Sequence, residues 1–393
     1  MVTVGGFLCL TFCNSSQPAD HDLLIDRLPQ HGVRRTTQAR TEAQRLRDLD
    51  RIKAYRDLDD RIRTQAASRS YGPALFQLTT ELLRLNPEHY TVWNIRRRCL
   101  TSALLTKTAN QQDQESDVSV LQSELAFTIP LLMAFPKCYW IWGFRQWILS
   151  QAILRLIVPV AREIWEAELG LTSTMLNKDQ RNFHAWDYRR IVVAKLESPQ
   201  LRGKSMAEDE FAYTTKMIRD NLSNFSAWHN RSQVIPRLLE ERGASSKMRA
   251  AFLVEELSFV QGGLNLDPED QSLWYYHQFL MSQLVDGGDR SATIAPDMDI
   301  RNKVFHVRRE IDEIKDLLED FARVKWIYGA LLEYTLALAR LEKDTARTDG
   351  ELSDIKTWLA KLRTLDPMRT GRWNDVERQI GHMQELRSGG TAT

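Results

Sequence analysis

Residues 182–190 read NFHAWDYRR and place an aromatic residue three positions before a tryptophan and an arginine three positions after it. The same setting recurs along the chain at intervals of 42 to 52 residues. Five copies match well and centre on Trp93, Trp142, Trp186, Trp228 and Trp274. Two degenerate copies follow, at Trp326 and Trp373. A period in the forties indicates a repeat architecture, which takes precedence over local readings of secondary structure.

Each copy predicts the start of a helix. An Asn or Asp stands seven residues before the tryptophan in five copies: Asn86, Asp179, Asn221, Asp267 and Asp366. Such side chains are common helix N-caps, because their oxygen accepts a backbone N–H that has no partner in the first turn. We therefore expect a helix to begin there and to carry the tryptophan about two turns in. The second copy has Phe135 at this position, which predicts a less well capped start.

The aromatic residue, the tryptophan and the arginine lie three positions apart, so we expect them to share one helix face and to pack on the next unit. The aromatic positions are Tyr90, Tyr139, Phe183 and Phe225, and the arginines are Arg96, Arg145, Arg189 and Arg231. A tryptophan at helical spacing is most often a core residue. The arginine is most simply a partner for a carbonyl or a carboxylate where two hairpins meet.

Between the tryptophan segments lie further helix-length stretches whose apolar residues recur every three to four positions, and strand-like alternation is nearly absent. The sequence therefore predicts an all-α solenoid of helical-hairpin repeats. We expect about seven repeats over residues 71–385, preceded by a charged helix within residues 31–70. Residues 1–30 are expected to be a disordered or spurious extension, and residues 386–393 a disordered tail. Polar or Gly-rich linkers are expected at 107–117 and 285–297.

The charge balance limits the kinds of partner. The 393 residues carry 53 basic and 52 acidic side chains, so no nucleic-acid-binding surface is indicated. No stretch approaches the ~20 apolar residues that a membrane span needs. The four cysteines lack the paired spacing of a metal site, which favours a reduced chain in the cytoplasm. No Gly-rich phosphate loop is present, and no metal ligand is assigned to this chain.

The repeated order of Asn or Asp, aromatic residue, Trp and Arg resembles the alpha-subunit repeat of the protein prenyltransferases. The resemblance covers about residues 31–385 and is specific because the motif occurs in several copies. Within the family, NFHAWDYRR, NFSAWHNRS and the segment HGVRR before the charged helix look most like the alpha subunit of Rab (type II) geranylgeranyltransferase. No immunoglobulin-like or leucine-rich segment is visible, so the chain resembles the compact form of this subunit.

The resemblance implies a heterodimeric enzyme that transfers geranylgeranyl from its diphosphate to C-terminal cysteines of Rab GTPases. In this family the beta subunit holds the zinc, the lipid pocket and most diphosphate contacts, and a Rab escort protein presents the substrate. The alpha subunit contributes a lysine that faces the departing diphosphate, which corresponds to Lys137, with Tyr139 beside it. An Asn–aromatic–His triplet, which in this family lies near the same diphosphate, corresponds to Asn182, Phe183 and His184.

Two alternatives remain open. One is the alpha subunit that farnesyltransferase shares with type I geranylgeranyltransferase. Trp140 occupies the slot where that subunit carries a residue that meets the substrate's terminal carboxylate, so recognition of a four-residue C-terminal box is not expected. The other alternative is a non-catalytic helical-repeat adaptor, but tetratricopeptide units are 34 residues long and the intervals here are longer. The lipid's length is not readable from this chain, because the resemblance places the lipid pocket on the partner.

Overall fold

The computed structural model describes residues 41–105, 111–285, 293–342 and 349–388, and within them it contains helices and no β-strand. The chain divides into two units, residues 1–60 and residues 61–393, which are described separately. The charged helix predicted within residues 31–70 is α1 (Glu42–Ala67), whose last seven residues belong to the second unit. In the first unit, α1 exposes Leu46, Leu49 and Ile52 among its charged side chains. The extension predicted at 1–30 lies outside the described residues.

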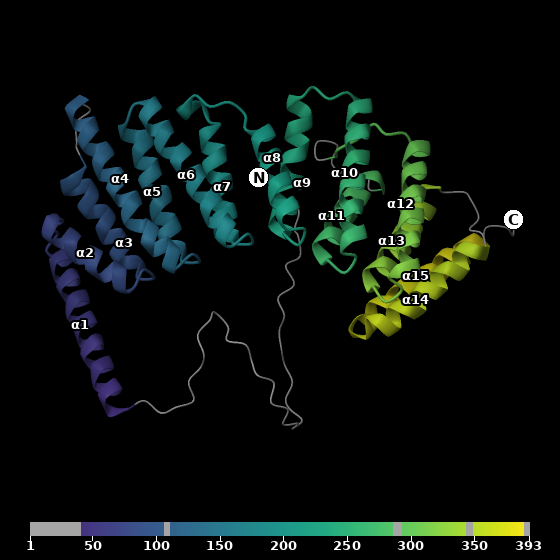
Figure 1. Cartoon of the computed structure of the whole chain (residues 1–393), viewed down its shortest axis with the longest axis horizontal. Coiled ribbons are helices and arrows are strands. Elements are labelled where there is room, and N and C mark those ends of the chain that lie inside the picture. The colour runs from purple at the N-terminus through teal and green to yellow at the C-terminus, as the bar shows by residue number, and fades with distance from the viewer. Residues whose placement is uncertain (1–40, 106–110, 286–292, 343–348, 389–393) are drawn as a thin grey trace. The chain divides into compact units, whose positions relative to one another are not determined.

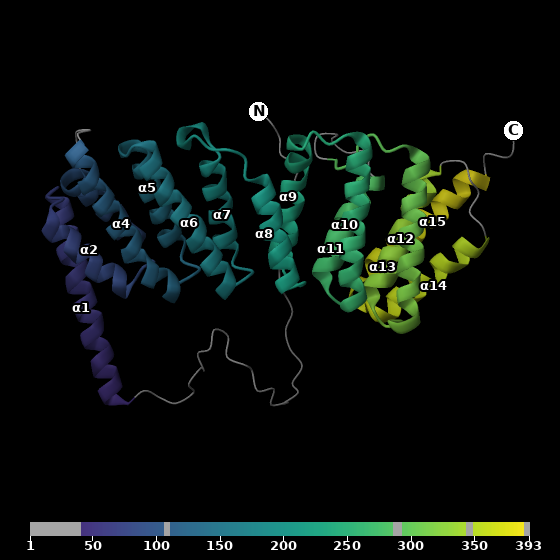
Figure 2. The same cartoon turned by 45° about the horizontal axis from the view of Figure 1, so that its top comes forward.

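The second unit is a series of helical hairpins, each packed on the next (Figure 1, Figure 2). Within its described residues the hairpins are α2 (Pro73–Leu85) with α3 (Tyr90–Cys99), α4 (Gln111–Ala134) with α5 (Tyr139–Arg155), α6 (Val158–Lys178) with α7 (Phe183–Leu196), α8 (Ala207–Asp220) with α9 (Phe225–Glu241), α10 (Ser246–Leu266) with α11 (Gln271–Val285), α12 (Ile300–Asp320) with α13 (Lys325–Leu341), and α14 (Asp349–Leu365) with α15 (Thr370–Ser388). Second helices of neighbouring hairpins also touch: α3 with α5, α5 with α7, α9 with α11, and α11 with α13. The predicted all-α solenoid of helical hairpins is confirmed.

The predicted helix starts were wrong by three residues. Asn86, Asp179, Asn221 and Asp267 end the preceding helix, and in each case Oδ1 accepts the backbone N–H two residues later. The next helix begins four residues after each of them, at the aromatic position or its equivalent. An Asn or Asp can close a turn on its own backbone as readily as it caps a helix, and the sequence alone does not separate the two roles. Phe135 likewise precedes a turn rather than capping α5.

Each well-matched tryptophan is therefore the fourth residue of its helix, and it is buried. Its indole Nε1 donates a hydrogen bond of 2.7–3.0 Å to the carbonyl six residues earlier, within the turn; the acceptors are Pro87, Pro136, Gln180, Leu222 and Pro268. This bond satisfies a turn carbonyl that has no helical partner. The tryptophan thus has two structural roles: it fills the core between hairpins, and it fixes the length of the turn before it.

The degenerate copy assigned to Trp326 was placed two residues too early. Helix α13 begins at Lys325, so its fourth residue is Tyr328. Tyr328 is buried, and its hydroxyl donates to the Ala322 carbonyl at 2.9 Å, which again lies six residues earlier. Trp326 is only half-buried. A tyrosine hydroxyl reaches the same acceptor as an indole N–H, and this substitution hid the register of the sixth hairpin.

A buried arginine on the second helix of each of the first four hairpins joins three helices, and we call this arrangement the arginine clamp. In the third hairpin, Arg189 on α7 donates to Ser173 on α6 at 3.0 Å and to Glu210 on α8 at 2.6 Å. The equivalent pairs are Arg96–Glu124, Arg145–Glu168 and Arg231–Glu256. Every member of these pairs is at most 5% exposed. A bidentate guanidinium–carboxylate pair fixes one geometry, so each clamp sets how two hairpins dock.

The fifth hairpin carries a histidine in place of the clamp arginine. His277 Nε2 lies 3.2 Å from Glu310 on α12, and its Nδ1 lies 2.9 Å from the Tyr334 hydroxyl on α13. Both ring nitrogens are thereby satisfied in a site that is almost fully buried. The threonine found 17 residues before each clamp arginine is here Val260, so both sides of the clamp have changed together.

Two helix boundaries differ from the sequence-based expectation, and so does the apolar length of one helix. Helix α4 begins at Gln111, so much of the linker predicted at 107–117 is helical. Helix α15 continues to Ser388, beyond the predicted end of the repeats, and residues 389–393 lie outside the described residues. By length and composition alone, residues 115–134 of α4 would suffice to cross a membrane, contrary to our expectation. This helix packs against α5 and carries the clamp residue Glu124, and a core helix satisfies the same test.

Gly203 is required by the connection between α7 and α8. A Cβ atom on Gly203 would lie 1.9 Å from the Leu196 carbonyl oxygen, which is a backbone atom and cannot rotate away. We expect Gly203→Ala to destabilise the chain by ~1–3 kcal/mol through this overpacking. Gly170→Ala on α6 is the matched control, because nothing lies within 4 Å of its added Cβ, and it should be neutral or slightly stabilising. Urea unfolding followed by circular dichroism compares them, and equal midpoints would contradict the expectation.

Candidate functional site

The turns between the two helices of each hairpin present exposed aromatic side chains. Four of them, Tyr90, Tyr139, Phe183 and Phe225, are the first residues of α3, α5, α7 and α9, and Tyr275 is the fifth residue of α11; each is 41–65% exposed. We call these five residues the aromatic edge. Ring centroids of Tyr139 and Phe183 are 6.3 Å apart, and those of Phe225 and Tyr275 are 6.1 Å apart. These rings therefore lie against the next hairpin, as expected, but unlike the buried Trp and Arg they stay exposed.

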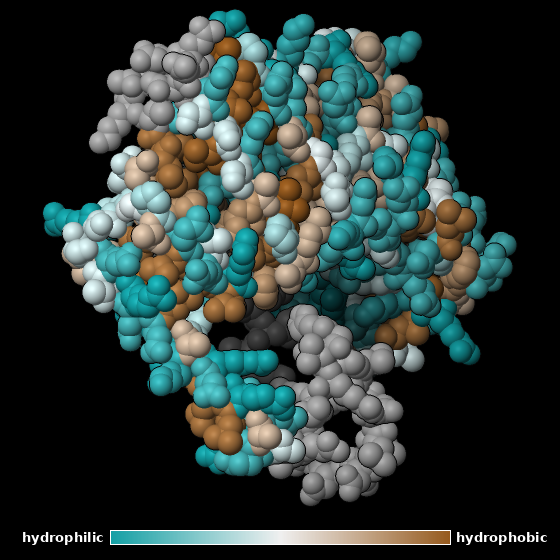
Figure 3. All heavy atoms as spheres, turned by 60° about the vertical axis from the view of Figure 1, so that its left-hand side comes forward, coloured by the Kyte–Doolittle hydropathy of each residue, from teal (hydrophilic) through white to brown (hydrophobic). Residues whose placement is uncertain are grey.

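A row of exposed aromatic residues is unusual for a surface that faces only water. Figure 3 shows one face of the molecule, on which hydrophobic side chains gather in patches between hydrophilic ones. Trp140 adds to the aromatic edge, since it is 42% exposed and its ring lies 5.3 Å from that of Tyr90. The aromatic edge has the composition of a contact surface for a partner or a ligand.

Lys137 lies in the turn between α4 and α5, two residues before Tyr139 of the aromatic edge. Its side chain is 62% exposed, and its Nζ lies 3.8 Å from Oδ2 of Asp179 in the next turn. The turn holds Lys137 in place without burying it, because Cys138 on one side is buried and Pro136 accepts two hydrogen bonds on the other. The ammonium is therefore available to an anion that approaches this end of the hairpins.

His184 lies beside Lys137 and is largely covered by aromatic rings. The Tyr139 ring meets it edge-on at 4.2 Å, and the Phe183 ring lies 4.0 Å away. Burial, together with the nearby Lys137 charge, lowers the pKa of His184, although the Asp187 and Glu88 carboxylates act in the opposite direction. The imidazole is neutral at pH 7, so Lys137 rather than His184 supplies positive charge at this point of the aromatic edge.

Asn182 is 1% exposed and connects the two turns that carry these residues. Its Oδ1 accepts the backbone N–H groups of His184 and Ala185, which makes Asn182 the N-cap of α7. Its Nδ2 donates to the Pro136 carbonyl at 3.2 Å. The structure thus brings Lys137, Tyr139 and His184 together and places Asn182 beneath them, with its amide already engaged.

The sequence analysis did not identify two sets of residues, the clamp glutamates and the aspartate that faces Lys137. The clamp glutamates were missed; they follow their arginines by 28, 23, 21 and 25 residues, and this uneven spacing gives no fixed motif. Asp179 was assigned as a cap, and its contact with Lys137 depends on two turns that are 42 residues apart. Only the stacking of hairpins brings these two charges together, and no local motif records it.

Cys138 adjoins Lys137 but is not a candidate nucleophile. Burial raises the pKa of its thiol to about 11, and Glu88 contributes in the same direction. We expect iodoacetamide to alkylate Cys138 at pH 8 on the order of 100-fold more slowly in the folded protein than in urea, because so little thiolate forms. Peptide mapping by mass spectrometry measures the rate at this residue, and equal rates in the two states would contradict the assignment.

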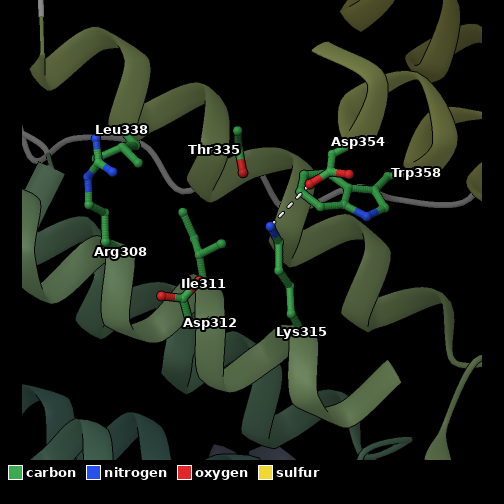
Figure 4. A pocket seen from close by; sticks show the side chains of 8 residues that line it. All are labelled: Arg308, Ile311, Asp312, Lys315, Thr335, Leu338, Asp354 and Trp358. Carbon is green, nitrogen blue, oxygen red and sulfur yellow. Dashed lines mark hydrogen bonds and ion pairs between the residues drawn. The ribbon is translucent and has the colours of Figure 1, made fainter. Parts of the chain in front are cut away.

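A small pocket lies between α12, α13 and α14 (Figure 4). Its volume is about 190 Å³, and Lys315 there pairs with Asp354 at 3.1 Å and lies 5.6 Å from the Trp358 ring centroid. A more open groove of about 620 Å³ lies along α10 and the start of α12 and includes Val254 and Asp299. Neither contains Lys137 or a residue of the aromatic edge. Over the described ranges, no three His, Cys, Asp or Glu side chains are grouped so as to hold a metal ion.

Comparison with known proteins identifies the repeat. The protein prenyltransferase alpha subunit repeat matches residues 74–103, 121–152, 165–196, 207–238 and 253–284, one segment in each of the first five hairpins. The structure of Candida albicans protein geranylgeranyltransferase-I complexed with GGPP is similar with a TM-score of 0.54 and 19% identity, over 82% of this chain and 89% of that one. At this identity the likeness shows the fold alone.

Two relatives match over nearly their whole length. The geranylgeranyl transferase type-2 subunit alpha of Candida albicans is 31% identical over 88% of this chain and 97% of its own length. The subunit of the same name from Dictyostelium discoideum is 33% identical over 89% of this chain and 100% of its own length. Such coverage agrees with the compact form expected from the sequence. The chain therefore belongs to the protein prenyltransferase alpha subunit family, alongside the alpha subunits of geranylgeranyl transferase type 2.

Proposed function

We propose that this chain is the alpha subunit of a heterodimeric Rab geranylgeranyltransferase. The observation that carries the proposal is the end-to-end match with type-2 alpha subunits, in a chain whose turn between α4 and α5 presents Lys137 beside Tyr139 and His184. The family match removes the ground for a non-catalytic adaptor. The transferred group is geranylgeranyl from its diphosphate, and the acceptors are C-terminal cysteines of Rab GTPases.

The beta subunit is the expected partner, and the aromatic edge is the surface we assign to it. An obligate subunit interface buries more than ~2,000 Å² and is rich in apolar residues, and the five exposed rings of the aromatic edge suit such a contact. The described residues do not fit a zinc site, so we place the zinc on the beta subunit, where it would keep the substrate thiol ionised near neutral pH. The lipid pocket is assigned to the beta subunit as well.

Lys137 is the residue of this chain that we assign to the reaction. As the acceptor sulfur bonds to C1 of the lipid, the C–O bond breaks and the diphosphate leaves with the electron pair. Negative charge gathers on the departing diphosphate, and a cation aimed at it lowers the barrier. A lysine on a flexible stem meets a diphosphate as a point charge, and Lys137 is exposed enough to do so.

The neighbours of Lys137 are assigned supporting roles. Neutral His184 can offer one N–H to a diphosphate oxygen, and Tyr139 covers the imidazole and shields it from water. Asn182 holds the α4–α5 turn against the start of α7 through its bond to Pro136. We therefore assign Asn182 to the positioning of Lys137 and His184, and the direct substrate contact that the resemblance implied for it stays a prediction.

The type-2 assignment concerns the protein substrate as well as the lipid. Trp140 fills a position beside the aromatic edge with a large ring tilted against that of Tyr90, which disfavours recognition of a terminal carboxylate there. A Rab escort protein is the expected source of the substrate, and a cytoplasmic location is the expectation that follows. The alternative is the alpha subunit of farnesyltransferase or type I geranylgeranyltransferase.

Reconstitution tests the proposal. The full chain is co-expressed with a type-2 beta subunit or, separately, with a farnesyltransferase beta subunit, and each complex is assayed with labelled geranylgeranyl and farnesyl diphosphates. We expect a stable complex and geranylgeranyl transfer to a Rab only with the type-2 partner, and only when escort protein is added. Transfer to a peptide with a four-residue C-terminal box by the farnesyl-type pair would favour the alternative, and the failure of both beta subunits to bind would overturn both assignments.

A further inference from the structure

Asp179 uses its two carboxylate oxygens for different contacts. Oδ1 accepts the backbone N–H of Arg181 at 3.2 Å and so closes the turn between α6 and α7. Oδ2 faces the preceding turn and lies 3.8 Å from the Lys137 ammonium, with both side chains well exposed. The carboxylate is therefore the nearest described anionic partner of the lysine that we assign to the diphosphate.

The same turn position in other hairpins shows that closing the turn needs no charge. Asn86 and Asn221 each accept the equivalent backbone N–H through an amide oxygen, at 3.1 and 3.0 Å. Asp267 does so at 3.3 Å, and among the described residues it forms no ion pair. An asparagine would serve the α6–α7 turn equally well, so the negative charge of Asp179 is free to act on Lys137.

We propose that Asp179 is a positioning residue for Lys137. Its carboxylate holds the Lys137 ammonium at the aromatic edge until the ammonium pairs with the diphosphate. This inference rests on the function proposed above. Before reaction, Asp179 competes with the bound diphosphate for the ammonium. As the C–O bond breaks, the diphosphate gains charge and the lysine moves wholly to it. Asp179 thereby opposes the contact between lysine and diphosphate, and the cost of breaking the Asp179–Lys137 pair is greatest in the transition state, where the lysine has left the carboxylate completely.

The size of the effect follows from the exposure of the pair. Solvent-exposed ion pairs contribute little, equivalent to a factor of about 1.4 to 5 in an equilibrium. That is enough to restrain a flexible side chain and too little to keep it from a multiply charged diphosphate. A comparable pair, Lys325–Asp366 at 3.4 Å, joins two later turns, so such a pair can also be a simple surface contact. The test must therefore separate positioning from a structural contact.

Asp179→Asn in the assembled heterodimer provides that test, because it keeps the oxygen that closes the turn and removes only the charge. We expect geranylgeranyl diphosphate to bind about two- to five-fold more tightly, and single-turnover transfer at saturating lipid to be as fast as wild type or slightly faster, because no ion pair has to be broken. Asp267→Asn is the matched control, since it makes the same change in an equivalent turn without a lysine. It should alter neither quantity, and both variants should melt at the wild-type temperature.

A double-mutant cycle identifies the pair as the cause. In a Lys137→Ala background, Asp179→Asn should change neither lipid binding nor the rate, because its partner is gone. The inference is overturned if Asp179→Asn leaves both quantities unchanged, weakens binding, or acts equally in the Lys137→Ala background. A Lys137→Ala heterodimer that reacts at the wild-type rate would instead refute the proposed role of Lys137 itself, so the two failures are distinguishable.

Discussion

Glu168→Ala should destabilise the chain by ~3–5 kcal/mol, the amount expected when one partner of a buried ion pair is removed. Glu168 accepts hydrogen bonds from Arg145 on α5, one of them 3.0 Å long, and from the Tyr188 hydroxyl on α7 at 2.6 Å. Burial, followed by the Glu168 charge, raises the pKa of Tyr188 well above its usual range, so the phenol stays protonated and donates. Without the carboxylate, Arg145 is left buried with its charge uncompensated.

Urea unfolding followed by circular dichroism, on the chain alone and in complex with its partner, measures this loss. Glu166→Ala is the matched control, because Glu166 lies two residues away on α6, is half exposed and, among the described residues, pairs only with Arg162. It should change the free energy of unfolding by no more than ~0.5 kcal/mol. Similar small losses in both variants would mean that the arginine clamp does not hold the hairpins together.

The repeat itself was readable from the sequence because it depends on spacing within one helix. Trp186 and Arg189 lie three positions apart, so a shared direction follows from helix geometry alone. The partners of Arg189 were not readable. Ser173 and Glu210 lie on two other helices, and their positions follow from how hairpins stack.

The local errors had a common cause. Asn and Asp satisfy backbone N–H groups both in turns and at helix starts, so Asp179 was read as the beginning of α7 when Asn182 is its N-cap. Once that start moved by three residues, Phe183 became the first residue of the helix, at its open end, where it is 56% exposed. The exposed aromatic edge, which we propose as the surface for the beta subunit, became visible only with this correction.

The candidate site was anticipated through resemblance rather than through physical reasoning from the residues. Lys137 carries no local signal, since an exposed lysine in a turn is ordinary. Its significance comes from the ring of Tyr139, from neutral His184 behind it and from Asp179 across the turn. These contacts join turns that are more than 40 residues apart, and single-sequence reasoning has no means to pair them.

Lys137→Ala should slow the chemical step of transfer by about 100-fold, the lower end of the ~100- to 1,000-fold loss expected for one electrostatic contact with a developing charge. We expect the lower end because cations of the beta subunit can act on the same diphosphate. Lipid binding should weaken far less, since the contact strengthens as the diphosphate departs. Lys137→Arg should restore only part of the rate, because a planar guanidinium does not occupy the place of a compact ammonium.

Lys325→Ala is the matched control for this variant. Lys325 also lies where the second helix of a hairpin begins, and it too faces an aspartate of the next turn, Asp366, at 3.4 Å. It belongs to the sixth hairpin, outside the five segments that match the family repeat. Its removal should leave the rate of transfer unchanged. Both variants should retain the wild-type melting temperature in complex, to within the ~0.5 kcal/mol expected of exposed lysines.

Single-turnover transfer of geranylgeranyl to an escort-bound Rab, at saturating lipid and beside a direct binding measurement for geranylgeranyl diphosphate, tests the central claim most directly. For an alpha subunit that acts on the departing diphosphate, the Lys137→Ala heterodimer should bind the lipid within a few-fold of wild type and react about 100-fold more slowly. A Lys137→Ala heterodimer that reacts as fast as wild type would contradict the claim and leave this chain as a scaffold for its partner.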